Sequence, residues 1–166
     1  MYRFLLKRIR YIYNPRFWVL KEIIAKMSLI IADKVVVYLD QFSGSFNIDI
    51  RSDIFFRLIH SGTYEQDLSL KIKDLIDPSQ DAIDIGANIG FFTVLIANII
   101  DEKSKVLSIE ASKNMFSALK ENVSINNLND KVILHYGAAS FEEGEIKINV
   151  IEGKEEYSSI KDINHP

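Results

Sequence analysis

The sequence predicts an α/β fold centred on a parallel βαβαβ unit, and two observations carry that prediction. Between residues 82 and 135, three short apolar runs of strand length alternate with two longer segments whose apolar residues recur at helical spacing. A glycine-rich turn joins the first strand to the first helix. Strands that alternate with helices in this way pair in parallel, because each helix carries the chain back to the start of the next strand.

Length and composition favour one domain with a small N-terminal extension. The 166 residues are 48% hydrophobic and 26% charged, which is typical of a globular protein. The absence of cysteine excludes disulfides, a thiol nucleophile and Cys-based metal sites. No metal site is expected, since the three histidines lack metal-ligand spacing and are expected to be structural or surface residues. They are His60, His135 and His165.

The N-terminal segment is basic. Residues 1–21 contain six Lys or Arg and no acid. Apolar residues recur at helical spacing over residues 5–13 and 17–32, and Asn14-Pro15 separates the two segments. These segments are predicted to be basic amphipathic helices, which either pack on the domain or contact a membrane surface through residues 1–30.

The rest of the chain is acidic. The whole chain carries −3 and residues 1–21 carry +6, so the remainder carries −9. Phosphate contacts need basic surface, so the charge leads us to exclude nucleic acid as a partner. Charges interrupt the apolar run at 17–32, and neither a transmembrane helix nor a signal peptide is predicted. A cytoplasmic location is expected, at most peripheral to the inner face of a membrane.

Residues 34–80 are predicted to form a β-hairpin and two helices that lead into the core. Apolar strands at 35–38 and 46–50 are joined through Ser43-Gly44-Ser45. Ser52 or Asp53 can cap a helix for which Gly62 is a suitable end. A second helix follows Glu65 and stops at Pro78-Ser79-Gln80.

The βαβαβ unit follows. Its first strand is predicted to be buried, and its first helix is so apolar that it must be covered on most sides. A half-exposed strand is predicted at 146–150. The elements of the unit are a strand at 82–85, a helix at 91–100, a strand at 106–109, a helix capped by Ser112 and a strand at 132–135. The predicted regions are 1–33, 34–80 and 81–166.

The turn Asp84-Ile85-Gly86-Ala87-Asn88-Ile89-Gly90 has the spacing of a ligand-binding loop at the carboxyl end of a parallel strand. Glu110 ends the second strand, where an acid can accept both hydroxyls of a ribose. A nicotinamide dinucleotide usually requires G-x-G-x-x-G, and this chain has Asn88 and Phe91 at the later glycine positions. The pattern favours S-adenosylmethionine, which has no phosphate. The alternatives are a helix-capping role for Asp84 and a solvated loop position for Glu110.

Four further segments strengthen this prediction, and with them the chain resembles FkbM-type methyltransferases. The segments are Gly62-Thr63-Tyr64-Glu65, Ile109-Glu110-Ala111, residues 122–127 and Gly137-Ala138-Ala139-Ser140. The resemblance covers about residues 34–160. It implies a class I Rossmann-like fold and O-methylation of a hydroxyl, often on a sugar or natural product, so the expected acceptor is a small molecule or glycan.

The resemblance also implies roles for individual residues. Asp84, Gly86 and Asn88, in the loop closed by Gly90, would line the methionine end of the cofactor. Glu110 would hold the ribose and Glu65 would reach the methionine amine. The segment Tyr136-Gly137-Ala138 would border the adenine. No residue is identified as the catalytic base.

The family pattern breaks near the end of the chain. A strand with an Ile-Asp-x-Glu-Gly-like motif should follow, and nothing similar precedes Pro166. The fold is therefore expected to be incomplete at its C-terminus, with strand 82–85 at an edge of the sheet. Three interpretations remain: a methyltransferase that is truncated or completed by a second chain or a homo-oligomer, a non-catalytic cofactor-binding or interaction remnant, and a nicotinamide-dinucleotide-binding module.

Overall fold

The computed structural model describes residues 33–140 and Gly144. The predicted helices at 5–13 and 17–32 and the predicted strand at 146–150 lie outside these residues. Within the described part, no helix is both long enough and apolar enough to cross a membrane.

The structure contains an antiparallel hairpin and a separate parallel sheet. The three strands of the parallel sheet lie in the order β3-β4-β5, which confirms the predicted α/β fold with a βαβαβ unit. The elements are β1 (Lys34–Leu39), β2 (Gly44–Asp49), α2 (Asp53–Ser61), α3 (Gln66–Leu75), β3 (Ala82–Ile85), α4 (Phe91–Ile99), β4 (Val106–Glu110), α5 (Lys113–Ile125) and β5 (Val132–Tyr136).

Local signals set the ends of the short helix α2. The Ser52 hydroxyl accepts a hydrogen bond from the Phe55 N–H and caps its first turn. Gly62 ends the helix with a φ of 74°, a left-handed conformation that glycine adopts without strain. The sequence predicted the end at Gly62 and left the cap open between Ser52 and Asp53.

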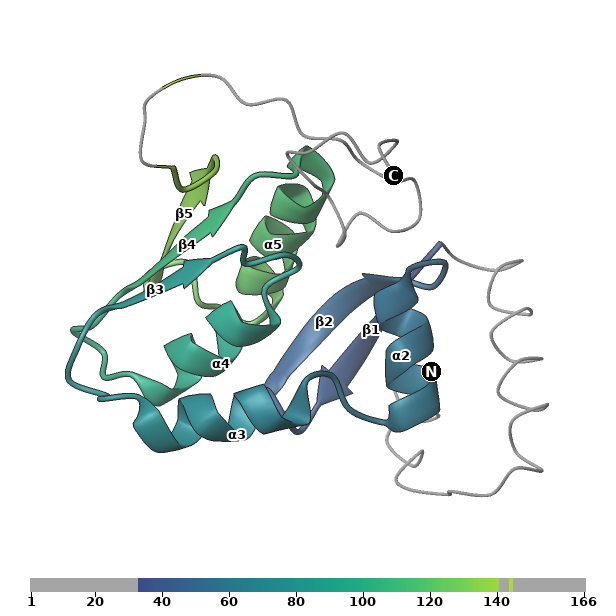
Figure 1. The fold of residues 1–166 in the computed structure, drawn as a ribbon, viewed down its shortest axis with the longest axis horizontal. Helices are drawn as coiled ribbons and strands as arrows, with labels where there is room; N and C mark the ends of the chain where they lie inside the picture. Colours follow the sequence, from purple (N-terminus) through teal and green to yellow (C-terminus); the bar gives the residue numbers. More distant parts are fainter. Residues whose placement is uncertain (1–32, 141–143, 145–166) are drawn as a thin grey trace, which may run out of the picture.

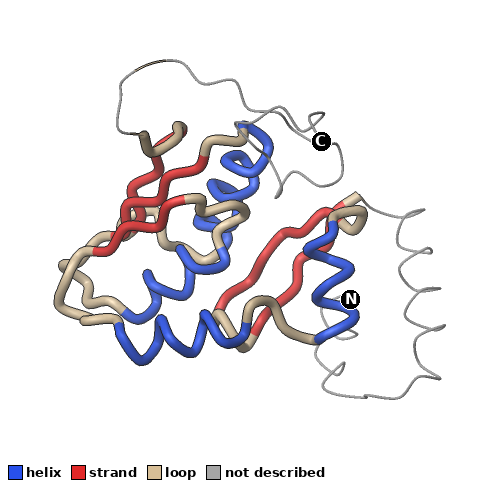
Figure 2. The backbone as a smooth tube through the Cα atoms, viewed as in Figure 1, coloured by secondary structure: helices blue, strands red, loops and turns tan. Residues whose placement is uncertain are grey.

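The helices α4 and α5 lie between the parallel sheet and the hairpin (Figures 1 and 2). A cluster of aromatic rings joins the hairpin to the start of α4. The Phe91 ring stacks on Phe42 at a centroid distance of 4.9 Å and meets Phe46 edge-on at 4.7 Å. All three side chains are buried, so the hairpin and the βαβαβ unit share one hydrophobic core.

Asn122 of α5 and Asn126, the residue that directly follows this helix, hold the hairpin through its backbone. The Asn126 amide accepts from the Ser45 N–H at 2.8 Å and donates to the Ser45 carbonyl at 2.7 Å. One turn earlier, Asn122 Oδ1 accepts from the Asn47 N–H at 2.7 Å. These side chains satisfy polar groups along the free edge of β2, as a neighbouring strand would do.

The opposite face of the parallel sheet is open within the described residues. Ile83 and Ile85 of β3 are 63% and 64% exposed, and Ile133 of β5 is also exposed. The prediction that β3 is a buried strand is therefore wrong for the face that carries Ile83 and Ile85. The described helices α4 and α5 both pack on the opposite face of the sheet. Among the described residues, β3 lies at an edge of the sheet, as expected.

Helix α3 packs less completely than its pattern predicts. Ile72 and Ile76 contact the core, as expected. Leu68 and Leu75, which were predicted on the same face, are exposed. The hydrophobic period therefore predicted the helix correctly, but it did not predict how many of its apolar residues are buried.

Candidate cofactor-binding site

The β3–α4 loop depends on glycine at two positions, for different reasons. Gly86 has a φ of 77°, and its N–H and that of Ala87 both donate to the Ile109 carbonyl, at 2.9 and 3.0 Å. Gly90 has a φ of 94°, and a Cβ there would lie 2.7 Å from Leu119 Cδ1. The first glycine allows the chain to turn beside β4, and the second allows α4 to approach α5.

Glu110 is fixed by backbone donors on both sides. Its side chain is 8% exposed, Oε2 accepts from the Asn88 N–H at 2.8 Å, and Oε1 accepts from the Ser112 N–H at 2.7 Å. The alternative that Glu110 is a solvated loop acid is therefore wrong. A carboxylate offers about four acceptor positions, so one held in this way can still accept both hydroxyls of a ribose.

Two buried polar atoms beside Glu110 lack a hydrogen-bond partner among the described residues. They are Asn88 Oδ1 and Ser112 Oγ. Ser112 begins α5, as predicted, but its hydroxyl makes no capping hydrogen bond, although the residue is only 3% exposed. A buried polar group without a partner costs roughly 1–3 kcal/mol, which a ligand with hydroxyl groups can recover. These residues therefore fit the ribose of S-adenosylmethionine.

Asp84, near the end of β3, belongs to a largely buried network of hydrogen-bonded side chains. Thr93 of α4 donates to Asp84 Oδ2 at 2.6 Å and lies 3.0 Å from the hydroxyl of Ser108 on β4. Burial raises the pKa of the Asp84 carboxyl, the Thr93 hydrogen bond opposes this rise, and the negative charge of Glu110 adds to it. Asp84 accepts from the side chain of Thr93, the third residue of α4, and not from a backbone N–H at the start of that helix, which argues against a capping role.

Three buried polar residues support the loop: Thr93 and Ser108 were not identified from the sequence, and Asn122 was noted only as part of the segment 122–127. Thr93 donates to Asp84 and contacts the hydroxyl of Ser108, and Asn122 Nδ2 donates to the Ile89 carbonyl at 2.8 Å. All three are fully buried. Each is a polar residue at an inward position of an apolar helix or strand, and that position was the available signal.

The segment expected to border the adenine follows β5. The Gly137 N–H donates to the Glu110 carbonyl at 3.0 Å, which brings this segment beside the end of β4. The Tyr136 ring lies 5.3 Å from that of Phe116. Ala138 is exposed one residue further on. The order of loops along this edge is thus 86–90, then 110–112, then 136–138.

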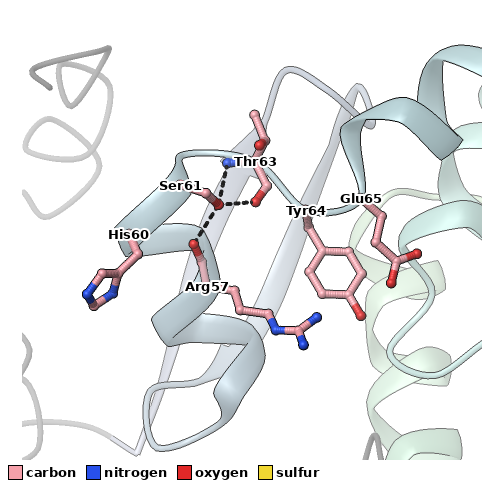
Figure 3. Close-up of a pocket in the computed structure, with 6 residues that line it drawn as sticks. All are labelled: Arg57, His60, Ser61, Thr63, Tyr64 and Glu65. Atoms are coloured by element: carbon pink, nitrogen blue, oxygen red, sulfur yellow. Dashed lines mark hydrogen bonds between the residues drawn. The ribbon is translucent and has the colours of Figure 1, made fainter.

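Glu65 lies on a different element from the other candidate residues. It precedes α3 with a φ of 46°, in the left-handed region, and its side chain does not cap the helix. It lines a cavity between α2 and α3, drawn in Figure 3. The link to the loop is indirect: the neighbouring Tyr64 ring lies 5.1 Å from the ring of Phe91, the first residue of α4.

Comparison with known proteins identifies the same fold. TYW2 from Pyrococcus horikoshii, in complex with MeSAdo, is 18% identical over 80% of this chain and 53% of its own, with a TM-score of 0.53. A transferase from the same organism is 17% identical over 75% of this chain and 50% of its own, with a TM-score of 0.50. The chain therefore spans about half the length of these structures. No curated protein sequence matches.

One partner prediction needs correction. The exclusion of nucleic acid is wrong, because a tRNA m1G37 methyltransferase from M. jannaschii is among the matching structures. It is 18% identical over 69% of this chain and 31% of its own, with a TM-score of 0.46. The charge argument failed because net charge averages over the whole chain, whereas phosphate contacts depend on local basic surface.

A family model described as protein-L-isoaspartate(D-aspartate) O-methyltransferase matches residues 34–144. The match confirms a methyltransferase and the predicted cofactor, S-adenosylmethionine, but it does not confirm the FkbM subtype. It covers the hairpin, the glycine loop, Glu110 and all three parallel strands. The chain belongs to the protein-L-isoaspartate(D-aspartate) O-methyltransferase family.

Proposed function

We propose that the loops at the carboxyl ends of β3, β4 and β5 bind S-adenosylmethionine, and that the chain is the cofactor-binding part of an O-methyltransferase. The observation that carries this proposal is the carboxylate of Glu110. It is buried, held by the N–H groups of Asn88 and Ser112, and flanked by two polar atoms without partners among the described residues. Such a carboxylate is oriented before the ligand arrives.

Each loop has a role in this proposal. Asp84, Gly86 and Asn88, in the loop closed by Gly90, line the methionine end, Glu110 binds the ribose, and the segment up to Ala138 borders the adenine. The cofactor supplies an electrophilic methyl group on its sulfonium. The residues of the chain hold the donor in line with the acceptor, and such positioning can contribute on the order of 7–11 kcal/mol.

The acceptor atom in this proposal is an oxygen. The family description names O-methylation of isoaspartate or D-aspartate in proteins. A hydroxyl on a sugar or small natural product, as in FkbM-type enzymes, remains a sequence-based hypothesis that the comparisons do not support. Because this chain spans about half the length of the matching structures, the proposed transfer needs a further segment or a second chain to complete the acceptor side.

The proposal is tested by titrating S-adenosylmethionine into the 166-residue chain by calorimetry. We expect binding by the wild type and no detectable binding by Glu110→Ala, since each hydrogen bond to a charged group contributes about 1.5–3 kcal/mol. Glu102→Ala, which removes an exposed loop acid, is the matched control and should bind normally. Circular dichroism checks that each variant is folded.

The remaining interpretations make different predictions in the same experiment. Tighter binding of a nicotinamide dinucleotide would support the dinucleotide module. Binding of the methyl donor without transfer, even after a completing chain is supplied, would support the non-catalytic remnant. Contact of residues 1–30 with a membrane remains a prediction, and liposome co-sedimentation that is unchanged after their deletion would contradict it. The boundaries 1–33, 34–80 and 81–166 also remain proposals.

A further inference from the structure

The hydroxyls of Thr93 and Ser108 meet inside the fold, where α4 packs on β4. Both side chains are fully buried, and their oxygen atoms lie 3.0 Å apart. Burying a hydroxyl costs free energy unless it is hydrogen-bonded, and a valine or an alanine would fill these positions without that cost. Packing alone therefore does not account for the pair.

The hydrogen bonds of this pair run in one direction. Thr93 has a single hydroxyl proton, which it donates to Asp84 Oδ2 at 2.6 Å. Thr93 must then accept in its contact with Ser108, so Ser108 is the donor. The reverse direction would leave the Ser108 proton without an acceptor, because this hydroxyl forms no other hydrogen bond within the part of the chain that the structure describes. The bonds therefore run from Ser108 to Thr93 to Asp84.

This directed pair of hydrogen bonds favours the ionised form of Asp84. Burial raises the pKa of Asp84 and the charge of Glu110 adds to the rise, whereas the Thr93 bond opposes it. The bond from Ser108 polarises the Thr93 hydroxyl and strengthens this opposition.

No positive charge from the neighbouring elements does the same work. The loop at 86–90 and helix α4 carry no charged side chain. The residues in register with Asp84 on β4 and β5 are Ser108 and Leu134. Among these described neighbours, the two hydroxyls are the groups that stabilise the carboxylate against burial and against Glu110.

We infer that Thr93 and Ser108 are positioning residues of the cofactor site, whose directed hydrogen bonds hold Asp84 as an oriented anion for the ammonium of S-adenosylmethionine. The inference rests on the proposed function, in which Asp84 lines the methionine end. A carboxylate offers about four acceptor positions, so the bond from Thr93 leaves others for the ligand. Thr93 and Ser108 act through Asp84 and do not touch the cofactor themselves.

The charge of Asp84 is measured by NMR of its carboxyl carbon as a function of pH. We expect the pKa of Asp84 to rise in Thr93→Val, which removes its donor, and to rise less in Ser108→Ala, which removes only the second bond. Thr93→Ser keeps the hydroxyl and should leave the pKa at its wild-type value. Ser69→Ala is the matched control, because Ser69 is a buried serine of α3 that bonds to other residues.

Calorimetry with two ligands links this charge to the cofactor. S-Adenosylhomocysteine carries the amino acid group, and 5′-methylthioadenosine shares its adenosine and sulfur but lacks that group. The ratio of the two affinities cancels effects on the ribose site and on folding, which both ligands share. Below the pKa of Asp84 this ratio should fall by up to about tenfold per pH unit, because a proton must leave before the ammonium binds. The midpoint of the fall should move to higher pH in Thr93→Val and, by less, in Ser108→Ala.

Two results would overturn the inference while the proposed function stands. An unchanged pKa of Asp84 in Ser108→Ala would show that the two hydroxyls do not act as a directed pair. A pKa that rises without a matching shift in the affinity ratio would show that the charge of Asp84 does not serve the cofactor. A wild type that binds neither ligand would instead contradict the proposed function, and this inference falls with it.

Discussion

The ends of β3 and β4 each place one acid at the candidate site, and the two acids are held in opposite ways. Glu110 is held by two backbone N–H groups from the loops on either side of it. Asp84 is held by the hydroxyl of Thr93, which also contacts Ser108 in the core. Backbone donors thus satisfy both carboxylate oxygens of Glu110, whereas burial raises the pKa of Asp84.

Because they are held differently, the two acids are expected to affect stability and ligand binding in different ways. Glu110 ties the β3–α4 loop to the start of α5, so its charge stabilises the site and is oriented for a ligand. Burial and the nearby charge of Glu110 both raise the pKa of Asp84, so its charged form is disfavoured in the folded state. We therefore expect Glu110 to support both stability and binding, and Asp84 to favour binding at the expense of stability.

The largest loss of stability is expected for Glu110→Gln. The amide keeps the shape of the side chain but turns one acceptor into a donor, which then faces the N–H of Asn88 or Ser112. We expect the free energy of unfolding, measured in urea, to fall by about 2–3 kcal/mol. A change below 0.5 kcal/mol would show that the two backbone bonds do not tie these loops together.

The next largest loss of stability is expected for Thr93→Val. This nearly isosteric change removes the donor to Asp84 and leaves the buried carboxylate without that bond. Unfolding in urea at pH 7 should show a loss of about 1–3 kcal/mol. The loss should be smaller in the Asp84→Asn background, where the acceptor is neutral, and additive effects of the two substitutions would contradict direct coupling.

Asp84→Asn is expected to increase the stability of the protein at pH 7, whereas the two preceding substitutions lower it. Because the folded state raises the pKa of Asp84 above its ordinary value of 3.8, wild-type stability is lost as pH rises through the window above 3.8. The variant lacks this loss, so at pH 7 it should be more stable than the wild type. Thermal unfolding should show the gain shrinking as pH falls toward 4, while S-adenosylmethionine affinity falls. A destabilised variant at pH 7 would contradict the raised pKa.

The smallest effect on stability is expected for Ser112→Ala. A capping serine normally contributes about 1 kcal/mol, but this hydroxyl makes no capping bond, so the change should be within about 0.5 kcal/mol. Cofactor affinity should still fall several-fold if the hydroxyl binds the ribose. Ser52→Ala is the control, because Ser52 does cap α2 and its loss should cost about 1 kcal/mol without affecting the cofactor.

The sequence was sufficient for features that depend on nearby residues. The strand at 82–85, the end of α2 at Gly62 and the glycine loop were all predicted, and the cap of α2 was narrowed to Ser52 or Asp53, because backbone conformation and hydrophobic period specify these features locally. Glu110 was identified by its place at the end of the second strand, although its backbone partners could not be predicted.

Features that depend on tertiary packing were not predicted. The hydrogen bonds of Asn122 join residues more than 30 positions apart, so no local pattern indicates them. The exposure of Ile83 and Ile85 depends on which face the helices cover, and an apolar strand alone does not reveal this. Glu65 was carried over from a family motif, and only the structure places it in a cavity with Arg57.

The most direct test of this account is to follow the backbone amides by ¹H–¹⁵N NMR while S-adenosylhomocysteine is added. We predict that the largest shifts fall on residues 86–90, 110–112 and 136–138, with Asn88 and Ser112 among them, because their N–H groups bind the carboxylate that receives the ribose. Saturable shifts confined to other parts of the chain would contradict the central claim that the carboxyl ends of the parallel strands form the cofactor site.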